Sequence, residues 1–194
     1  MNFLKNIYIW TLKKAEHKNA KWYLSLISFA ESSFFPIPPD ILLIPMALAS
    51  KTKALFYAFI CTLSSVLGGI FGYAIGYFFF NSIGLYIVEF YHLENSFSIF
   101  ENYYKEFGIL IVLGAGITPF PYKFITIASG VFGLNIYLFV IVSIIGRGLR
   151  FYLIAILLYF FGEKIKLFID KYFNILSITF FILLVGSVFI IRFI

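Results

Sequence analysis

Residues 54 to 80 form a run of 27 residues without a charged side chain, and residues 173 to 191 form another of 19. At about 1.5 Å per residue, a helix of about 20 residues crosses the roughly 30 Å hydrocarbon core of a bilayer. Charged residues make up 12% of the 194 residues, whereas soluble domains carry about 25%. We therefore predict an all-α integral membrane protein with transmembrane helices at 54–80 and, near the C-terminal end, at 173–191.

The first 21 residues differ from the rest because they contain five lysines and no long apolar run. Their bulky apolar side chains recur at three- and four-residue steps, as in an amphipathic helix lying on a membrane surface. These side chains are Phe3, Leu4, Ile7, Tyr8 and Leu12. We predict an amphipathic interfacial segment at 1–21, and no cleaved signal peptide, because the segment lacks the apolar core and the cleavage motif of one.

Residues 22 to 50 are apolar but interrupted by prolines, which leave pieces of about 14 and 10 residues. Neither piece is long enough to cross a membrane alone. Proline removes a backbone donor and disfavours helix at the preceding residue. We therefore predict a re-entrant hairpin at 22–50, with both ends on the same side of the membrane. Such a backbone is tolerated at membrane depth only when it is buried in protein or lines a cavity.

A second interrupted segment, 108–134, repeats this pattern. Its motif Thr118-Pro-Phe-Pro-Tyr-Lys123 aligns without a gap with Phe35-Pro-Ile-Pro-Pro-Asp40, and the apolar segment 135–161 that follows corresponds to 54–80. The chain is therefore predicted to contain two copies of a re-entrant hairpin plus a transmembrane helix. The prolines predicted to break the hairpins are Pro36, Pro38, Pro39, Pro119 and Pro121.

The lysines predict how these segments are oriented, because basic residues concentrate on the cytoplasmic side of membrane proteins. With the N-terminus in the cytoplasm, a re-entrant first hairpin returns Lys51 and Lys53 to that side, and 54–80 leads the chain outward. The predicted external loop, 81–107, contains four glutamates and one lysine. The two copies then enter the membrane from opposite faces, as in the inverted repeats of transporters.

Five ionisable residues lie within the apolar segments. They are Glu31, Asp40, Lys123, Arg147 and Arg150. An isolated charge at the bilayer centre costs at least about 2.5 kcal/mol, so such groups usually pair or line a watery cavity. Guanidinium groups bind phosphate and carboxylate bidentately. We predict phosphate binding by Arg147 and Arg150, assisted by Lys123, and proton exchange by Glu31 and Asp40. A structural ion pair that closes the hairpin is an equal alternative for the two acids.

An alternative reading places the arginines at the membrane surface, because residues 124–146 are also uncharged and long enough to span. That reading leaves 151–162 too short to cross, so we favour arginines in the interior. The glycines of the first spanning segment are predicted to pack helices closely, as small residues do in membranes. They are Gly68, Gly69, Gly72 and Gly76.

Motifs of the familiar enzyme classes are missing from the sequence, which contains no zinc-protease, P-loop or nucleophile-elbow pattern. We therefore predict no enzyme activity, no catalytic residue, no metal site and no cofactor. The net charge of +6 is ascribed to membrane topology and not to nucleic acid.

The segment Glu31-Ser-Ser-Phe-Phe-Pro-Ile-Pro-Pro-Asp40, the glycine-rich span Gly68 to Tyr77, the run Ala128-Ser-Gly130 and the segment Gly146 to Tyr152 together resemble the DedA family. These are bacterial inner-membrane proteins of the SNARE-associated Golgi (VTT domain) superfamily, and the chain is most similar to the YqaA-like branch. The resemblance covers about residues 22–162, which we expect to form a DedA/VTT-like membrane domain.

The resemblance implies a multi-pass protein of the bacterial inner membrane, with a role in membrane homeostasis tied to the proton motive force. It implies movement of polyprenyl phosphate or phospholipid, with important acids at Glu31 and Asp40 and basic residues at Lys123, Arg147 and Arg150. Family members carry an arginine-proline-arginine arrangement in the second hairpin, where this chain has only Lys123. Phosphate binding would therefore depend more on the two arginines.

The expected partners are anionic membrane lipids and protons, with no nucleic acid, and a homo-oligomer is left open. Three other functions remain as alternatives. They are a proton-coupled carrier of small ions or drugs, a non-transporting membrane-organising protein, and an intramembrane lipid enzyme.

Overall fold

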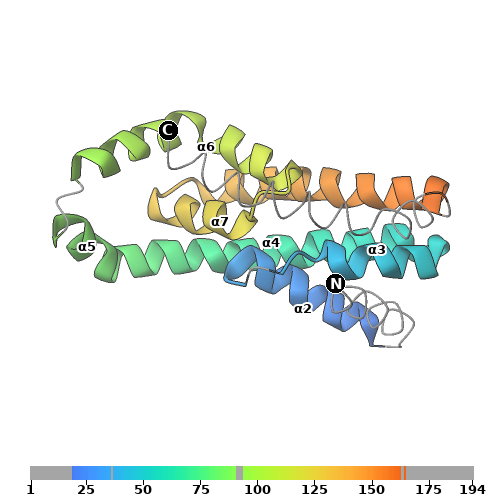
Figure 1. The fold of residues 1–194 in the computed structure, drawn as a ribbon. Coiled ribbons are helices and arrows are strands. Elements are labelled where there is room, and N and C mark those ends of the chain that lie inside the picture. The colour runs from blue at the N-terminus through green and yellow to red at the C-terminus, as the bar shows by residue number, and fades with distance from the viewer. Residues whose placement is uncertain (1–18, 36, 91–93, 163, 165–194) are drawn as a thin grey trace, which may run out of the picture.

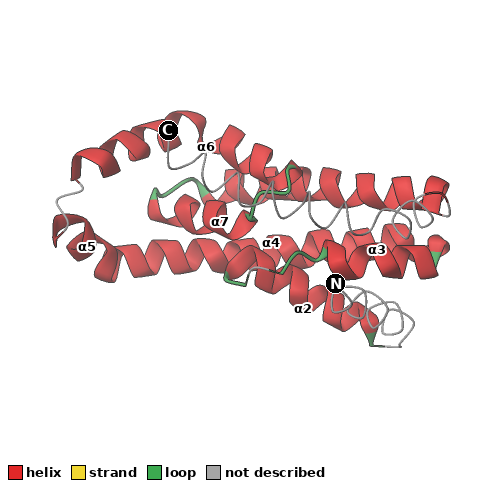
Figure 2. Cartoon of the chain, in the orientation of Figure 1, coloured by secondary structure: helices red, strands yellow, loops and turns green. Residues whose placement is uncertain are grey.

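The computed structural model describes residues 19–35, 37–90, 94–162 and 164. In these residues the chain forms helices joined by short loops, without strands (Figure 2). The prediction of an all-α protein is thus confirmed for the described part of the chain. The predicted C-terminal helix at 173–191, most of the predicted interfacial segment at 1–21, and Pro36 lie outside it.

Among the described residues, two helices are long and apolar enough to cross a membrane. The first is α4 (Ala54–Phe79), which the short helix η1 (Lys51–Lys53) extends at its start, and the second covers Ile136–Gly162. They lie side by side and run in opposite directions (Figure 1). Asn135 directly precedes the helix Ile136–Gly162, and its side-chain oxygen accepts hydrogen bonds from the backbone N–H groups of Tyr137 and Leu138, as a helix N-cap does.

The first proline-rich segment forms two short helices, α2 (Ala20–Ser33) and α3 (Asp40–Ala49). Figure 1 shows α2 running from one end of the molecule to its middle and α3 returning to the same end. Pro39 directly precedes α3, and Asp40 occupies its first turn, where a negative charge interacts favourably with the helix dipole.

The second proline-rich segment also forms a pair of helices, α6 (Glu94–Ile117) and α7 (Tyr122–Val131). This pair enters the middle of the molecule from the opposite end (Figure 1). Gly133 follows α7 with φ of 62°, a left-handed conformation that glycine adopts without steric cost.

The segment predicted as an external loop, 81–107, is helical wherever the structure describes it. A π-helical turn (η2, Phe80–Gly84) and α5 (Leu85–Phe90) continue from α4, and α6 already begins at Glu94. The second hairpin is therefore longer at its start than predicted. The charges in this region sit on a helix surface, where Glu101 and Lys105 pair at 2.7 Å with i,i+4 spacing, and they do not mark a loop.

Helix α4 packs against both α2 and α7, and its glycines lie at these contacts. A Cβ atom at Gly68 would lie 2.1 Å from the carbonyl oxygen of Phe29 in α2, and one at Gly76 would lie 2.0 Å from that of Ile127 in α7. A Cβ at Gly72 would lie 2.4 Å from the side-chain oxygen of Thr126, whereas one at Gly69 would make ordinary contacts at 3.4 Å. The backbone of α4 therefore lies so close to those of α2 and α7 that Gly68 and Gly76 leave no room for a side chain.

We expect Gly68→Ala and Gly76→Ala to destabilise the protein, because each methyl group would collide with a backbone carbonyl. Overpacking of this kind costs about 1–3 kcal/mol. Gly114→Ala is the matched control, since Gly114 also lies within a helix and a Cβ there would meet no described residue within 4 Å. Thermal unfolding of the detergent-purified variants should rank both below the control. Equal unfolding temperatures for all three would contradict the close approach.

Candidate functional site

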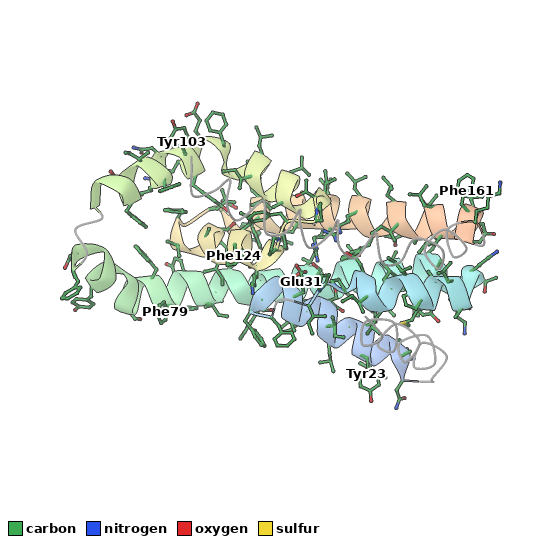
Figure 3. The ribbon with its side chains drawn as sticks, in the orientation of Figure 1. Tyr23, Glu31, Phe79, Tyr103, Phe124 and Phe161 are labelled. Atoms are coloured by element: carbon green, nitrogen blue, oxygen red, sulfur yellow. The ribbon has the colours of Figure 1, made fainter. Side chains whose placement is uncertain are left out.

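The two helix breaks meet in the middle of the molecule. Glu31 lies there, between Tyr23 and Phe161 toward one end and Phe79 and Tyr103 toward the other (Figure 3). The last turn of α2 and the first turn of α3 come from one side, and those of α6 and α7 from the other (Figure 1). Four of the five ionisable residues predicted to form the site are joined here in two ion pairs.

The first pair joins Glu31 of α2 to Arg147 in the helix Ile136–Gly162. Arg147 Nη2 lies 2.5 Å from Glu31 Oε2, and Arg147 Nε donates to Ser65 Oγ of α4 at 2.6 Å. The side chain of Arg147 is 1% exposed, and that of Glu31 is 10% exposed. The guanidinium carbon also lies 4.9 Å from the ring centroid of Tyr122 and 4.7 Å from that of Phe151. Hydrogen bonds, the ion pair and cation–π contacts thus stabilise this buried cation together.

Glu31 receives further hydrogen bonds on both carboxylate oxygens. The backbone N–H of Tyr122, at the start of α7, lies 3.3 Å from Oε1, and Ser32 Oγ donates to Oε2 at 3.1 Å. The N-terminal end of a helix carries a partial positive charge and unpaired N–H groups. Glu31 therefore links the end of the first hairpin's inward helix to the start of the second hairpin's returning helix.

The second pair joins Asp40 of α3 to Arg150, one turn after Arg147. Arg150 Nη2 hydrogen-bonds to Asp40 Oδ2, and Nη1 donates to the carbonyl oxygen of Thr118, just after α6, at 2.6 Å. The side chain of Arg150 is 12% exposed, and that of Asp40 is 19% exposed. The other carboxylate oxygen, Asp40 Oδ1, is buried and has no hydrogen-bond partner among the described residues. Arg150 thus connects the two breaks through a pair that is less enclosed than the first.

Lys123 does not join either pair. It is partly exposed on α7, its ammonium lies 5.3 Å from the ring centroid of Phe124, and it makes no ion pair within the described ranges. The alignment of the two halves places Lys123 opposite Asp40, but Lys123 forms no ion pair with an acid that the structure describes. The break prolines that are described flank these groups, with Pro39 just before α3 and Pro121 just before α7.

A seam of serines between α2 and α4 was not predicted from the sequence. Ser25 and Ser32 pair with Ser64 and Ser65 at 2.7 and 2.6 Å, and Ser28 donates to the carbonyl oxygen of Cys61 at 2.7 Å. The signal was available, because the serines of α2 recur at three- and four-residue steps and so share one face. This seam carries polar contacts to the buried arginine through Ser65.

Tyrosines fix α7 in place. Tyr122 and Ser143 pair through their hydroxyl groups at 2.6 Å, and Tyr73 donates to the carbonyl oxygen of Leu134 at 2.6 Å. Tyr104 of α6 pairs with Ser129 at 2.7 Å. Burial raises the pKa of Tyr104 to about 12, so its hydroxyl stays protonated near neutral pH. The described residues contain no group of three or more His, Cys, Asp or Glu side chains arranged to hold a metal ion.

Relatives of the chain are found by sequence comparison. An uncharacterized protein of Haemophilus influenzae is 34% identical over 192 residues, which cover 99% of this chain and 100% of the relative. The chain belongs to its family. Another uncharacterized member, from Histophilus somni, is 34% identical over 167 residues, or 84% of this chain and 85% of the relative. No family model matches the chain, and no solved structure matches it significantly.

We expect Arg147→Ala to destabilise the protein strongly, because it leaves the Glu31 carboxylate buried without its main partner. Removing one member of a buried pair costs about 3–5 kcal/mol. Arg150→Ala should cost less, since its pair is more exposed. The control is Lys105→Ala, which removes an exposed pair worth at most about 1 kcal/mol. Thermal unfolding in detergent measures the order. An Arg147→Ala variant as stable as the control would contradict a stabilising role for the buried ion pair.

Proposed function

We propose that this protein is a multi-pass protein of the bacterial inner membrane that moves an anionic, phosphate-bearing lipid across the bilayer, with proton exchange at its carboxylates. Polyprenyl phosphate and phospholipid are the candidate substrates. The observation that carries the proposal is the enclosure of two carboxylate–guanidinium pairs at the point where two broken helical hairpins meet.

The surfaces of the two long helices support the membrane assignment. Both carry rows of large, exposed apolar side chains, among them Phe59 and Leu63 on α4 and Ile145 and Leu149 on Ile136–Gly162. A continuous surface of this kind is unfavourable in water and marks an interaction or membrane face. With α4 and Ile136–Gly162 across the bilayer, the breaks between them would lie near the midplane, where transporters with inverted repeats bind substrate.

The helix ends at the breaks support an anionic substrate. The N-terminal ends of α3 and α7 are occupied by the carboxylates of Asp40 and Glu31. Helix N-termini and guanidinium groups bind phosphate with the same donors that they offer to a carboxylate. A lipid phosphate can therefore replace a carboxylate at an arginine once that carboxylate has taken up a proton. Binding of proton and lipid would then be linked through competition for one guanidinium.

The resemblance to the DedA family agrees with this function, since its members are tied to lipid movement and to the proton motive force. The resemblance implies a phosphate site at Arg147 and Arg150, of which Arg150, the more exposed of the two, would receive the phosphate. Lys123, partly exposed on α7, would attract the headgroup toward it.

One observation favours a second candidate, a non-transporting membrane-organising protein. Arg147 is almost fully enclosed by its partners, as expected of a charge that only holds helices together. In that case variants of the ion pairs would affect the protein only through its stability.

We expect the purified protein in proteoliposomes to move fluorescent phospholipid or polyprenyl phosphate, and a pH gradient to change the rate. Arg150→Gln should slow this movement by about tenfold or more, the effect of losing one charge-assisted hydrogen bond. Lys105→Ala, an exposed change far from the breaks, should move lipid like the wild type.

Other outcomes of this assay identify the alternatives. Proton flux without movement of either lipid would contradict the proposal in favour of a carrier of small ions or drugs. Neither flux nor lipid movement by well-folded wild type would favour the organising protein.

A further inference from the structure

We infer that the two ion pairs have different roles. Protonation of Asp40 opens its pair with Arg150, whereas the pair of Glu31 and Arg147 stays closed and anchors the helices. This inference rests on the proposed function, because it names the proton site and the guanidinium that would receive the lipid phosphate. Neither role follows from the sequence, in which both acids flank the same break and both arginines lie on one helix face.

The hydrogen bonding of the two acids differs. Glu31 uses both oxygens and receives donors from three groups, a guanidinium, a helix N–H and a hydroxyl. Asp40 receives one guanidinium donor on Oδ2, and its buried Oδ1 has no partner in the described part of the structure. A buried carboxylate oxygen without a donor is costly. A proton can bind to Oδ1 without competing with any donor, whereas each oxygen of Glu31 already receives at least one hydrogen bond.

The two arginines differ in the same sense. Arg147 lies within 5 Å of two ring centroids and is bound to Ser65 as well as to Glu31. Arg150 lies 6.0 Å from one ring centroid and makes its only other hydrogen bond among the described residues to a backbone carbonyl. Its side chain and that of Asp40 are also more exposed than the first pair. The second pair is therefore the more accessible of the two, whereas the first is enclosed.

The charges around Asp40 determine what protonation does. In the helix Ile136–Gly162, Arg150 contacts Asp40, and Arg147 lies close enough to interact with it electrostatically. In α4, the Cys61 thiol also lies close enough to interact electrostatically with Asp40. From α2, Glu31 is bound to Arg147. The two acids and two arginines carry no net charge. Protonation of Asp40 leaves one unmatched positive charge, on Arg150, which one phosphodiester neutralises. One proton would thus accompany each singly charged headgroup.

Opening this pair also changes the contact between the hairpins. Arg150 joins Asp40, at the start of α3, to the carbonyl oxygen of Thr118, after α6. When Asp40 is neutral, Oδ2 can still accept a hydrogen bond from Arg150, but the attraction between opposite charges is lost and a phosphate can displace the acid. Glu31 meanwhile still receives the N–H of Tyr122. The second pair would therefore act as a latch between the breaks and the first pair as a permanent joint.

The test is binding of dihexanoyl phosphatidylglycerol to the full chain in non-ionic detergent, followed by calorimetry at about pH 5 and about pH 8. The phosphodiester of this lipid keeps its charge over that range, so a pH effect reports on the protein. Wild type should bind more tightly at the lower pH. Asp40→Asn, which mimics the protonated acid, should bind at the higher pH at least about tenfold more tightly than wild type, and its affinity should not change with pH.

Three variants complete the design. Lys105→Ala is expected to match the wild type, and Asp40→Asn combined with Arg150→Gln is expected to lose the gain in affinity. Glu31→Gln should either keep the wild-type pH effect or fail to fold, and both results agree with an anchoring role. The inference is overturned if Asp40→Asn binds no more tightly than wild type, or if Glu31→Gln abolishes the pH effect in a folded protein.

Dimethyl phosphate, which has the same charged group without acyl chains, separates this inference from the proposed function. If it binds as tightly as the lipid and with the same dependence on Asp40, the latch is supported but the lipid substrate is not. Binding of the lipid alone supports both.

Discussion

The buried guanidinium of Arg147 imposes the strictest requirement on this fold. Removing such a cation from water costs several kcal/mol unless each donor and the charge itself find partners. The partners come from α2, α4 and α7 as well as from its own helix, through Glu31, Ser65, Tyr122 and Phe151. Satisfying one charge therefore holds four helices in register. Close packing at the glycines of α4 brings these helices near enough for the contacts to form.

The charges and the helix breaks depend on each other. Each break leaves backbone groups without their usual helical partners, which is costly away from water. The N–H of Tyr122 is satisfied by Glu31, and the carbonyl oxygen of Thr118 by Arg150. The ionised side chains in turn need donors and acceptors that an unbroken helix does not offer. A proline break without the charges, or the charges without the break, would leave polar groups unpaired in the interior.

The sequence was informative where structure depends on local pattern. Uncharged runs and prolines predicted helices and their interruptions, and the all-α architecture is confirmed in the described residues. The residues 81–107 were misjudged because charges on a helix surface resemble those of a loop. The partner of each acid could not be predicted. Pairing of Glu31 with Arg147, 116 residues away, depends on how two hairpins cross, and no local pattern encodes that crossing. The serine seam was predictable from its spacing.

The distribution of charge between the two halves of the chain determines how the ion pairs would respond to motion of one half against the other. Both acids lie in the first half of the chain and both arginines in the second, so each ion pair crosses between the halves. Any motion of one half against the other must either preserve or break a pair. The pair of Arg147 has more partners and less exposure, and it would break last. Relative motion is therefore expected to pivot about Arg147 and to open at Arg150, whose pair is the more exposed of the two.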